Sequence, residues 1–306
     1  MNIIGLDIGG SKIGIGVVRL RRGFKVLSYE KIVTGENLTA KKLVALIEAS
    51  IKKYISSSVA AIGVGIAGQV DFQNGVVRHG PNLPTAFDNL RLRSILEKKF
   101  KLPVVIDNDV HCFALAEALH GAGRGHGAIF GITIGTGVGG GLVMNGKIDR
   151  GATNTVGEIG HLSVGGDALC SCGKKGHVEA YAGGRRMMAR YEKLTGKNLK
   201  ALDLENLYKK GDKNARMIVN EAATALAASI SNALVLMNPD CIVIGGGLSR
   251  FPELIALIKK QIPELLPFPI LKKTPILISK LGDQAGVVGA ALLIRSNYKN
   301  QASNIK

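Results

Sequence analysis

Residues 2–20, NIIGLDIGGSKIGIGVVRL, contain the strand–turn–strand pattern on which the fold prediction rests. Two apolar runs, 2–8 and 13–20, flank a glycine turn, and a third run follows at 24–33. Short runs rich in Ile and Val and bounded by turn residues predict β-strands. A second stretch, AIFGITIGTGVGGGLVM at residues 128–144, has the same strand–turn–strand order. The chain therefore contains two units that begin in the same way.

Helical and strand patterns continue in the same order after both openings. In the first unit we predict a helix at 39–55, a strand at 60–66, a helix at 90–100, a strand at 104–106 and a helix at 109–119. In the second we predict strands at 128–134 and 138–144, a weaker strand near 160–164, a helix after His177, a helix at 213–237, a strand at 241–244, a helix at 254–265, a strand at 276–279 and a final helix at 283–294.

Two βββαβαβα units predict an α/β protein with two lobes and a cleft between them, because open sheets bind ligands near the carboxyl ends of their strands. We expect an N-terminal lobe at residues 1–118, with residues 283–306 packing back onto it. The C-terminal lobe is expected at residues 119–282.

The composition predicts a cytoplasmic protein that does not bind nucleic acid. The 306 residues are 46% hydrophobic, which is enough for a substantial core, and no apolar run reaches the ~20 residues that span a membrane. The start carries no signal-peptide pattern. A net charge of +17 would suit nucleic acid, but aromatic residues are only 5% and tryptophan is absent. The lysines recur in pairs that predict solvated faces, at 41–42, 52–53, 98–99, 174–175, 209–210, 259–260 and 272–273.

One short segment, EIGHLSVGGDALCSCGKKGHVEAYAGG, carries metal-ligand chemistry. Two thiolates and two imidazoles are what a closed tetrahedral zinc site requires, and the segment supplies His161, Cys170, Cys172 and His177. Carboxylates flank the set at Glu158 and Glu179, which indicates an organised polar pocket. The alternative is two core thiols and two histidines in turns. Cys-x-Cys is a poor disulfide, so pairing of the two thiols is not a competing explanation.

Three glycine-rich turns follow predicted strands. Glycine lets main-chain amides approach phosphate oxygens. The alternative for any one turn is a plain hairpin, which explains the first turn alone equally well. The first two join strand to strand, which argues against a dinucleotide fingerprint. Asp7 ends a strand beside the first turn and is a candidate for holding Mg²⁺ through water, or else an ordinary turn cap. The candidate nucleotide residues are Asp7, Gly9, Gly10, Ser11, Lys12, Thr133, Gly135, Thr136, Gly137, Gly245, Gly246 and Gly247.

A polar cluster, Asp107-Asn108-Asp109, follows the strand at 104–106. An N-cap explains one polar residue there but not three. A carboxylate at this place can accept a proton from a substrate hydroxyl, and Asp109 is our candidate for that base. From the residues alone, catalysis and helix capping are equally good explanations.

The motifs DIGGSKIGIGVV, GVGIAGQVD, IDNDV, GTGVGGG, VGEIGHLSV, CSCGKKGHVEAYAGG and GDQAGVVGAALL together resemble the ROK family of bacterial sugar kinases and related repressors. The resemblance spans nearly the whole chain and implies the two-lobed actin-like ATPase (ribonuclease H-like) fold. It also implies ATP and Mg²⁺ as cofactors, structural Zn²⁺, and a homodimer or homotetramer.

The resemblance implies a role for each site residue. Asp109 takes the position of the base that accepts the proton of the sugar 6-hydroxyl. The glycine turns take the positions of the phosphate and adenosine sites. The expected sugar ligands are Gly68, Asn82, Asn108, Asp109, Glu158, His161 and Glu179.

Three departures from the family pattern stand out. His177 replaces the usual third cysteine, Asp107 replaces a more usual glutamate, and the segment after Pro84 lacks a tryptophan that is often found there.

The sequence therefore predicts an ATP-dependent kinase of a hexose 6-hydroxyl, with glucose as the first candidate. An N-acetylglucosamine or N-acetylmannosamine kinase is the nearest alternative. A catalytically silent sugar-binding regulator and a filament-forming ATPase are alternatives from other classes. The first would bind sugar without releasing ADP, and the second would hydrolyse ATP without sugar.

Overall fold

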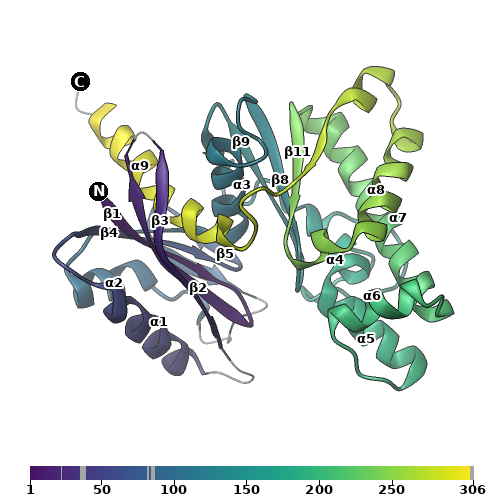
Figure 1. Cartoon of the computed structure of the whole chain (residues 1–306), viewed down its shortest axis with the longest axis horizontal. Helices are drawn as coiled ribbons and strands as arrows, with labels where there is room; N and C mark the ends of the chain where they lie inside the picture. Colours follow the sequence, from purple (N-terminus) through teal and green to yellow (C-terminus); the bar gives the residue numbers. More distant parts are fainter. Residues whose placement is uncertain (22, 35–38, 81–82, 84–86, 304–306) are drawn as a thin grey trace. The chain divides into compact units, whose positions relative to one another are not determined.

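The computed structural model describes residues 1–21, 23–34, 39–80, 83 and 87–303, and it divides into two compact units (Figure 1). The first unit comprises residues 1–125, 141–156 and 280–306, and the second comprises 126–140 and 157–279. The domain limits given by the sequence, 1–118 and 119–282, remain predictions.

The first unit is built on a five-stranded sheet of order β3-β2-β1-β4-β7. Its strands β1, β2 and β3 are antiparallel neighbours, whereas β4 and β7 run parallel to β1. Figure 1 shows α1 and α2 together on one face, where buried Leu43, Ile47 and Leu96 pack into the core. The elements are β1 (Asn2–Ile8), β2 (Lys12–Leu20), β3 (Phe24–Val33), α1 (Ala40–Tyr54), β4 (Val59–Ile66), β5 (Gln69–Asp71), β6 (Val76–His79), α2 (Leu92–Phe100), β7 (Val104–Asn108) and α3 (Asp109–His120).

Helix α9 (Ala285–Ser303) packs on the glycines of this sheet. Gly5 and Gly63 are paired across β1 and β4, so both face the same side. A Cβ atom at Gly5 would collide with the Val287 carbonyl, and one at Gly63 would collide with the Ala290 carbonyl. The absence of side chains at these positions therefore sets how closely α9 approaches the sheet.

The second sheet has the order β10-β9-β8-β11-β12, which repeats the third-second-first-fourth-fifth order of the first sheet. This confirms the predicted duplication at the level of strand topology. Its elements and the helices of the second unit are β8 (Ala128–Ile134), β9 (Val138–Met144), β10 (Lys147–Asp149), α4 (Val178–Ala182), α5 (Gly184–Thr195), α6 (Ala201–Lys209), α7 (Lys213–Met237), β11 (Cys241–Gly245), α8 (Pro252–Leu265) and β12 (Ile276–Ile278). Short 3₁₀ helices are η2 (Ile159–His161), η3 (Gly247–Arg250), η4 (Pro269–Lys273) and η5 (Gly282–Gln284).

The prediction of a third strand near residues 160–164 was wrong. That segment begins as η2, and the third strand is β10, which pairs with β9 through a two-residue turn. The turn is Asn145-Gly146, with φ of 51° and 73°. Both angles are positive, as a type I′ hairpin turn requires, and Asn-Gly is the dipeptide that favours this turn most.

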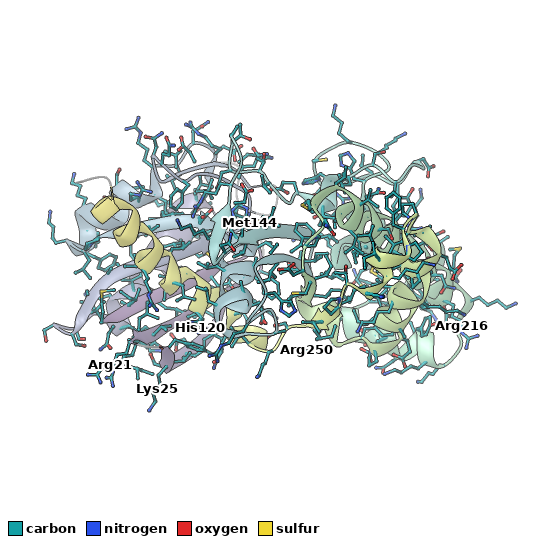
Figure 2. All side chains as sticks on the ribbon, turned by 90° about the horizontal axis from the view of Figure 1, so that it is seen from above. Arg21, Lys25, His120, Met144, Arg216 and Arg250 are labelled. Atoms are coloured by element: carbon teal, nitrogen blue, oxygen red, sulfur yellow. The ribbon has the colours of Figure 1, made fainter. Side chains whose placement is uncertain are left out.

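Helix α7 has the bounds that the sequence predicted, and its length and apolar composition would alone allow it to cross a membrane. However, 67% of its apolar window is buried inside the protein, as is usual for a core helix. Both members of each of the seven lysine pairs are exposed, which confirms their prediction as solvated positions. Figure 2 shows Arg21, Lys25 and Arg216 extending outward in the same way.

Candidate functional site

The turn between β7 and α3 brings the predicted acidic cluster together in the first unit. Asn108 is the N-cap of α3, and its side-chain oxygen accepts hydrogen bonds from Val110 N at 2.8 Å and His111 N at 3.2 Å. Its amide nitrogen donates to the Gly68 carbonyl at 2.9 Å. Gly68 has a φ of 105°, which an L-residue rarely adopts, and a Cβ there would collide with the His79 carbonyl. Asn108 therefore holds the Gly68 turn beside the start of α3.

Asp109 occupies the first turn of α3, beside Asp7 at the end of β1. Asp7 pairs with Gly65 of β4, and a Cβ at Gly65 would lie 3.3 Å from Asp109 Cα. Burial, and secondly the negative charge of Asp109, raise the pKa of Asp7 to about 7, with Lys31 opposing them. A divalent cation would relieve the penalty on the Asp7 carboxylate, so Asp7 fits Mg²⁺ held through water.

Asp107, predicted as part of the same cluster, is fully buried at the centre of an ionic network. Its Oδ1 accepts from His111 Nδ1 at 3.0 Å and Asn154 Nδ2 at 3.1 Å, and its Oδ2 accepts from Arg150 Nε at 2.9 Å and Nη2 at 2.7 Å. Burial opposes ionisation, but the hydrogen bonds and charges of these partners outweigh it and lower the pKa of Asp107. Burial likewise opposes protonation of His111, but Asp107 outweighs it and raises the pKa of the imidazole.

The second and third glycine turns lie together in the second unit. Thr133 of β8 pairs with Gly245 of β11, and Gly246, with a φ of 86°, packs directly against the backbone of Ile134. The start of α5 contacts the second turn, because Gly184 N donates to the Gly135 carbonyl at 2.8 Å. The first turn, closed by the 3.0 Å bond from Gly9 N to the Lys12 carbonyl, belongs to the first unit.

The four predicted metal ligands converge in the second unit. One ligand atom from each of His161, Cys170, Cys172 and His177 lies within 4.8 Å of all the others. Cys170 Sγ is 3.6 Å from His161 Nδ1, and Cys172 Sγ is 3.3 Å from His177 Nδ1. Zinc bonds of about 2.3 Å to sulfur and 2.0 Å to nitrogen give a tetrahedral S···N edge of about 3.5 Å. The residues therefore fit a tetrahedral zinc ion.

Glu179 joins this cluster to the second glycine turn. The carboxylate is buried, its Oε2 accepts from Val138 N at 3.1 Å, and its Oε1 accepts from Ser171 Oγ. Cys170 Sγ also lies 3.7 Å from Oε1. A Cβ at Gly137 would collide with Oε2, so glycine is required at that point of the turn. Glu158 immediately precedes η2, which carries His161.

Sequence reasoning missed part of this arrangement. Nothing in the sequence pattern singled out Arg150 or Asn154, because they reach Asp107 only through the β9–β10 hairpin that the prediction misplaced. Asn82, a predicted sugar ligand, lies outside the described residues.

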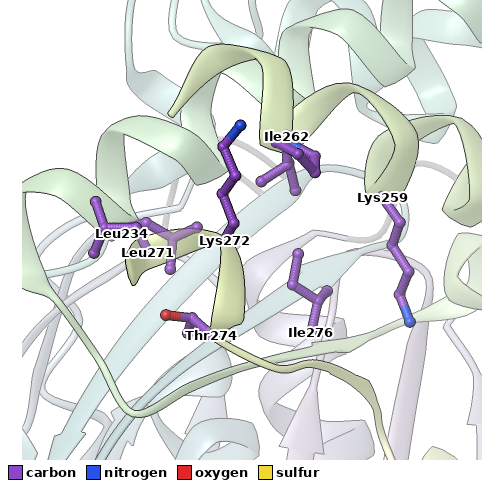
Figure 3. Close-up of a pocket in the computed structure, with 8 residues that line it drawn as sticks. Leu234, Lys259, Ile262, Leu271, Lys272, Thr274 and Ile276 are labelled. Atoms are coloured by element: carbon purple, nitrogen blue, oxygen red, sulfur yellow. The ribbon is translucent and has the colours of Figure 1, made fainter. Parts of the chain in front are cut away.

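A pocket elsewhere in the second unit contains none of the predicted site residues. Figure 3 shows it between α7, α8, η4 and β12, lined by Leu234, Lys259, Ile262, Pro263, Leu271, Lys272, Thr274 and Ile276.

Comparison with known proteins identifies the family. A profile of the ROK family matches residues 3–297 of the chain. The chain belongs to the ROK family. This ROK protein therefore has the actin-like ATPase fold that its motifs led us to expect, and its two sheets agree with that fold.

Three proteins that are similar to this chain are named as sugar kinases. An N-acetyl-D-glucosamine kinase of Pectobacterium carotovorum is 34% identical over 301 residues, covering 94% of this chain and 97% of the relative. A ROK family glucokinase from Streptomyces griseus, solved in complex with glucose and AMPPNP, is 32% identical with a TM-score of 0.84, covering 97% and 100%. A ROK hexokinase from Thermus thermophilus is 30% identical with a TM-score of 0.82, covering 98% and 100%.

Proposed function

We propose that this ROK sugar kinase transfers the γ-phosphoryl group of ATP to the 6-hydroxyl of a hexose. The observation that carries the proposal is the β7–α3 turn. It holds Asn108, Asp109 and Gly68 together, and it does so in a chain that matches named sugar kinases over nearly its full length. The three glycine-rich turns favour an enzyme over a silent sugar-binding regulator. A filament-forming ATPase gives no reason for the cysteine–histidine cluster.

In the proposed reaction, Asp109 accepts the proton of the sugar 6-hydroxyl while that oxygen attacks the γ-phosphorus. The new O–P bond forms as the bond to the β-phosphate oxygen breaks, and ADP leaves with the electron pair. Asn108 and Gly68 orient the sugar on the first unit. Glu158, His161 and Glu179 are the proposed sugar ligands of the second. Such transfer depends mainly on in-line positioning and on neutralisation of charge.

Two metal ions belong to the proposal. Asp7 would hold Mg²⁺ through water beside the first glycine turn, where the ion would supply charge neutralisation for the phosphates. Zn²⁺ would bind His161, Cys170, Cys172 and His177. With Nδ1 facing Cys170, the His161 ring would have Nε2 left to meet a sugar hydroxyl.

The proposal also concerns which sugar accepts the phosphoryl group. Glucose is the acceptor that the motifs favour, and N-acetyl-D-glucosamine is the second candidate because a relative named for that activity is 34% identical over 94% of the chain. A coupled ADP-release assay across glucose, mannose, fructose, N-acetylglucosamine and N-acetylmannosamine separates them by kcat/KM. ADP release at the same rate with and without every sugar would refute the proposed function.

A further inference from the structure

The ionic network behind the β7–α3 turn consists of Asp107, His111, Arg150 and Asn154, and all four lie in the first unit. The Asp107 carboxylate accepts five hydrogen bonds, of which three come from the cationic groups of His111 and Arg150. Charge-assisted bonds of this kind are the strongest that side chains make, and a bidentate guanidinium also fixes orientation. The carboxylate is therefore held in a single geometry.

The two nitrogens of the His111 ring both face acceptors. Nδ1 lies 3.0 Å from Asp107 Oδ1, and Nε2 lies 3.3 Å from the Val156 carbonyl oxygen. Neither acceptor carries a proton in this network, so both contacts are hydrogen bonds only when the imidazole is doubly protonated. The geometry therefore requires His111 as an imidazolium ion, buried against an aspartate.

The network contacts two segments that carry sugar ligands proposed for this unit, the start of α3 and the strand after Gly68. Asp107 Oδ1 accepts from Asn108 N at 2.8 Å, so it fixes the residue that caps α3 and precedes Asp109. Asn154 Nδ2 donates to the Val70 carbonyl at 2.8 Å, two residues beyond Gly68. Arg150 stacks on Phe72, with its guanidinium carbon 3.6 Å from the ring centroid. One buried carboxylate thus ties together the α3 cap, the strand after Gly68 and the segment after β10.

We propose that His111 and Arg150 are positioning residues of the kinase. Through Asp107 they hold Asp109 and the Gly68 turn in fixed positions relative to each other. This inference rests on the proposed function. Neither side chain needs to touch sugar or nucleotide. Displacing a reacting group by about 1 Å costs on the order of 100-fold in rate, so loss of either cation reaches the chemistry through geometry alone.

If His111 acts as an imidazolium ion, turnover should have a descending limb in its pH profile. The titratable and charged groups that face the His111 ring are Asp107 from β7 and Arg150 from the segment after β10, while Val156 contributes only a carbonyl. Because Asp107 raises the pKa of His111, the imidazolium persists at low pH and is lost as pH rises through that pKa. Turnover of the wild type should fall in that range, and a His111→Gln variant should lack this limb.

The test compares Arg150→Lys, His111→Gln and their double variant with a matched control. Lysine keeps the charge but not the bidentate fork, and glutamine keeps one donor but not the charge. The control is Arg78→Lys, whose guanidinium binds Asp71 in the same unit but is 51% exposed. We expect each test variant to lower kcat by about 10- to 100-fold with little change in the KM for ATP, and the control to stay within about 2-fold.

Two readouts separate positioning from general destabilisation. Residues that act as a unit are non-additive, so the double variant should be no slower than about 3-fold below the slower single variant. Nitrogen-15 NMR of the wild type should report His111 as an imidazolium ion at pH 7. Losses that multiply in the double variant, unchanged kcat in the single variants, or a neutral His111 would each overturn the inference. Absence of any sugar-dependent ADP release by the wild type would instead refute the proposed function, and the positioning role with it.

Discussion

Replacing Asp7 by asparagine should stabilise the metal-free protein, and increasingly so as the pH rises. Asp7 has a pKa of about 7 in the folded chain against an ordinary value of 3.8. Between these values the folded state binds a proton that the unfolded state has released, so the free energy of unfolding falls as pH rises. A pKa that is about three units higher in the folded chain corresponds to about 4 kcal/mol. This is an upper bound on the free energy of unfolding that the buried carboxylate removes above pH 7. Between pH 5 and pH 8 the penalty grows by about 2.5 kcal/mol.

The assay is urea unfolding in EDTA at pH 5, 6.5 and 8, with wild type, Asp7→Asn and Asp167→Asn compared at each pH. Asp167 is exposed, so its variant controls for removing one negative charge. We expect the stability of Asp7→Asn relative to this control to rise with pH by up to about 2.5 kcal/mol. A difference that is constant with pH, or that falls, would refute the reasoning that burial and Asp109 disfavour the Asp7 carboxylate. In the proposed kinase the same variant should also lower the affinity for Mg²⁺.

Three further predictions concern the base, the metal and the sheet. Asp109→Asn should lower kcat by about 100-fold or more while sugar affinity by calorimetry changes little, because the carboxylate is needed for proton transfer rather than for binding; equal turnover would remove Asp109 from its role. Elemental analysis should give one zinc per chain, and Cys172→Ser or a strong chelator should lower both the melting temperature and sugar affinity; a metal-free protein of full stability and activity would exclude the zinc site. Gly63→Ala should lower the free energy of unfolding by about 2 kcal/mol or more because its Cβ meets the Ala290 carbonyl. Gly23→Ala, whose Cβ meets nothing within 4 Å, should lower it much less. Equal losses in the two variants would contradict the close packing of α9.

The sequence was most informative where a pattern is local. The Ile- and Val-rich runs around the first glycine turn predicted β1 and β2 to within a residue. The apolar face of α7, together with the Asn238-Pro239 pair that stops it, predicted both ends of that helix. The four candidate metal ligands could be named from the sequence because cysteine and histidine are scarce and these four lie within 17 residues of one another. In each case residues close in sequence are sufficient to specify the structure.

The failures have physical causes of the opposite kind. The strand β10 was missed because the local hairpin signal Asn145-Gly146 was passed over in favour of a weaker strand pattern at 160–164. That segment instead begins as η2. Arg150 could not be assigned to Asp107 from the sequence. The two are 43 positions apart, and their contact depends on the hairpin register rather than on any spacing.

In the proposed reaction, Asp109 directs phosphoryl transfer to a sugar 6-hydroxyl. Phosphorus-31 and proton NMR of the reaction mixture would test it most directly, with ATP and either glucose or N-acetylglucosamine as substrates. We expect the wild type to form the hexose 6-phosphate and ADP in equal amounts, and Asp109→Asn to form at least about 100-fold less in the same time. Phosphate attached at another hydroxyl, or inorganic phosphate released without any sugar ester, would contradict the account.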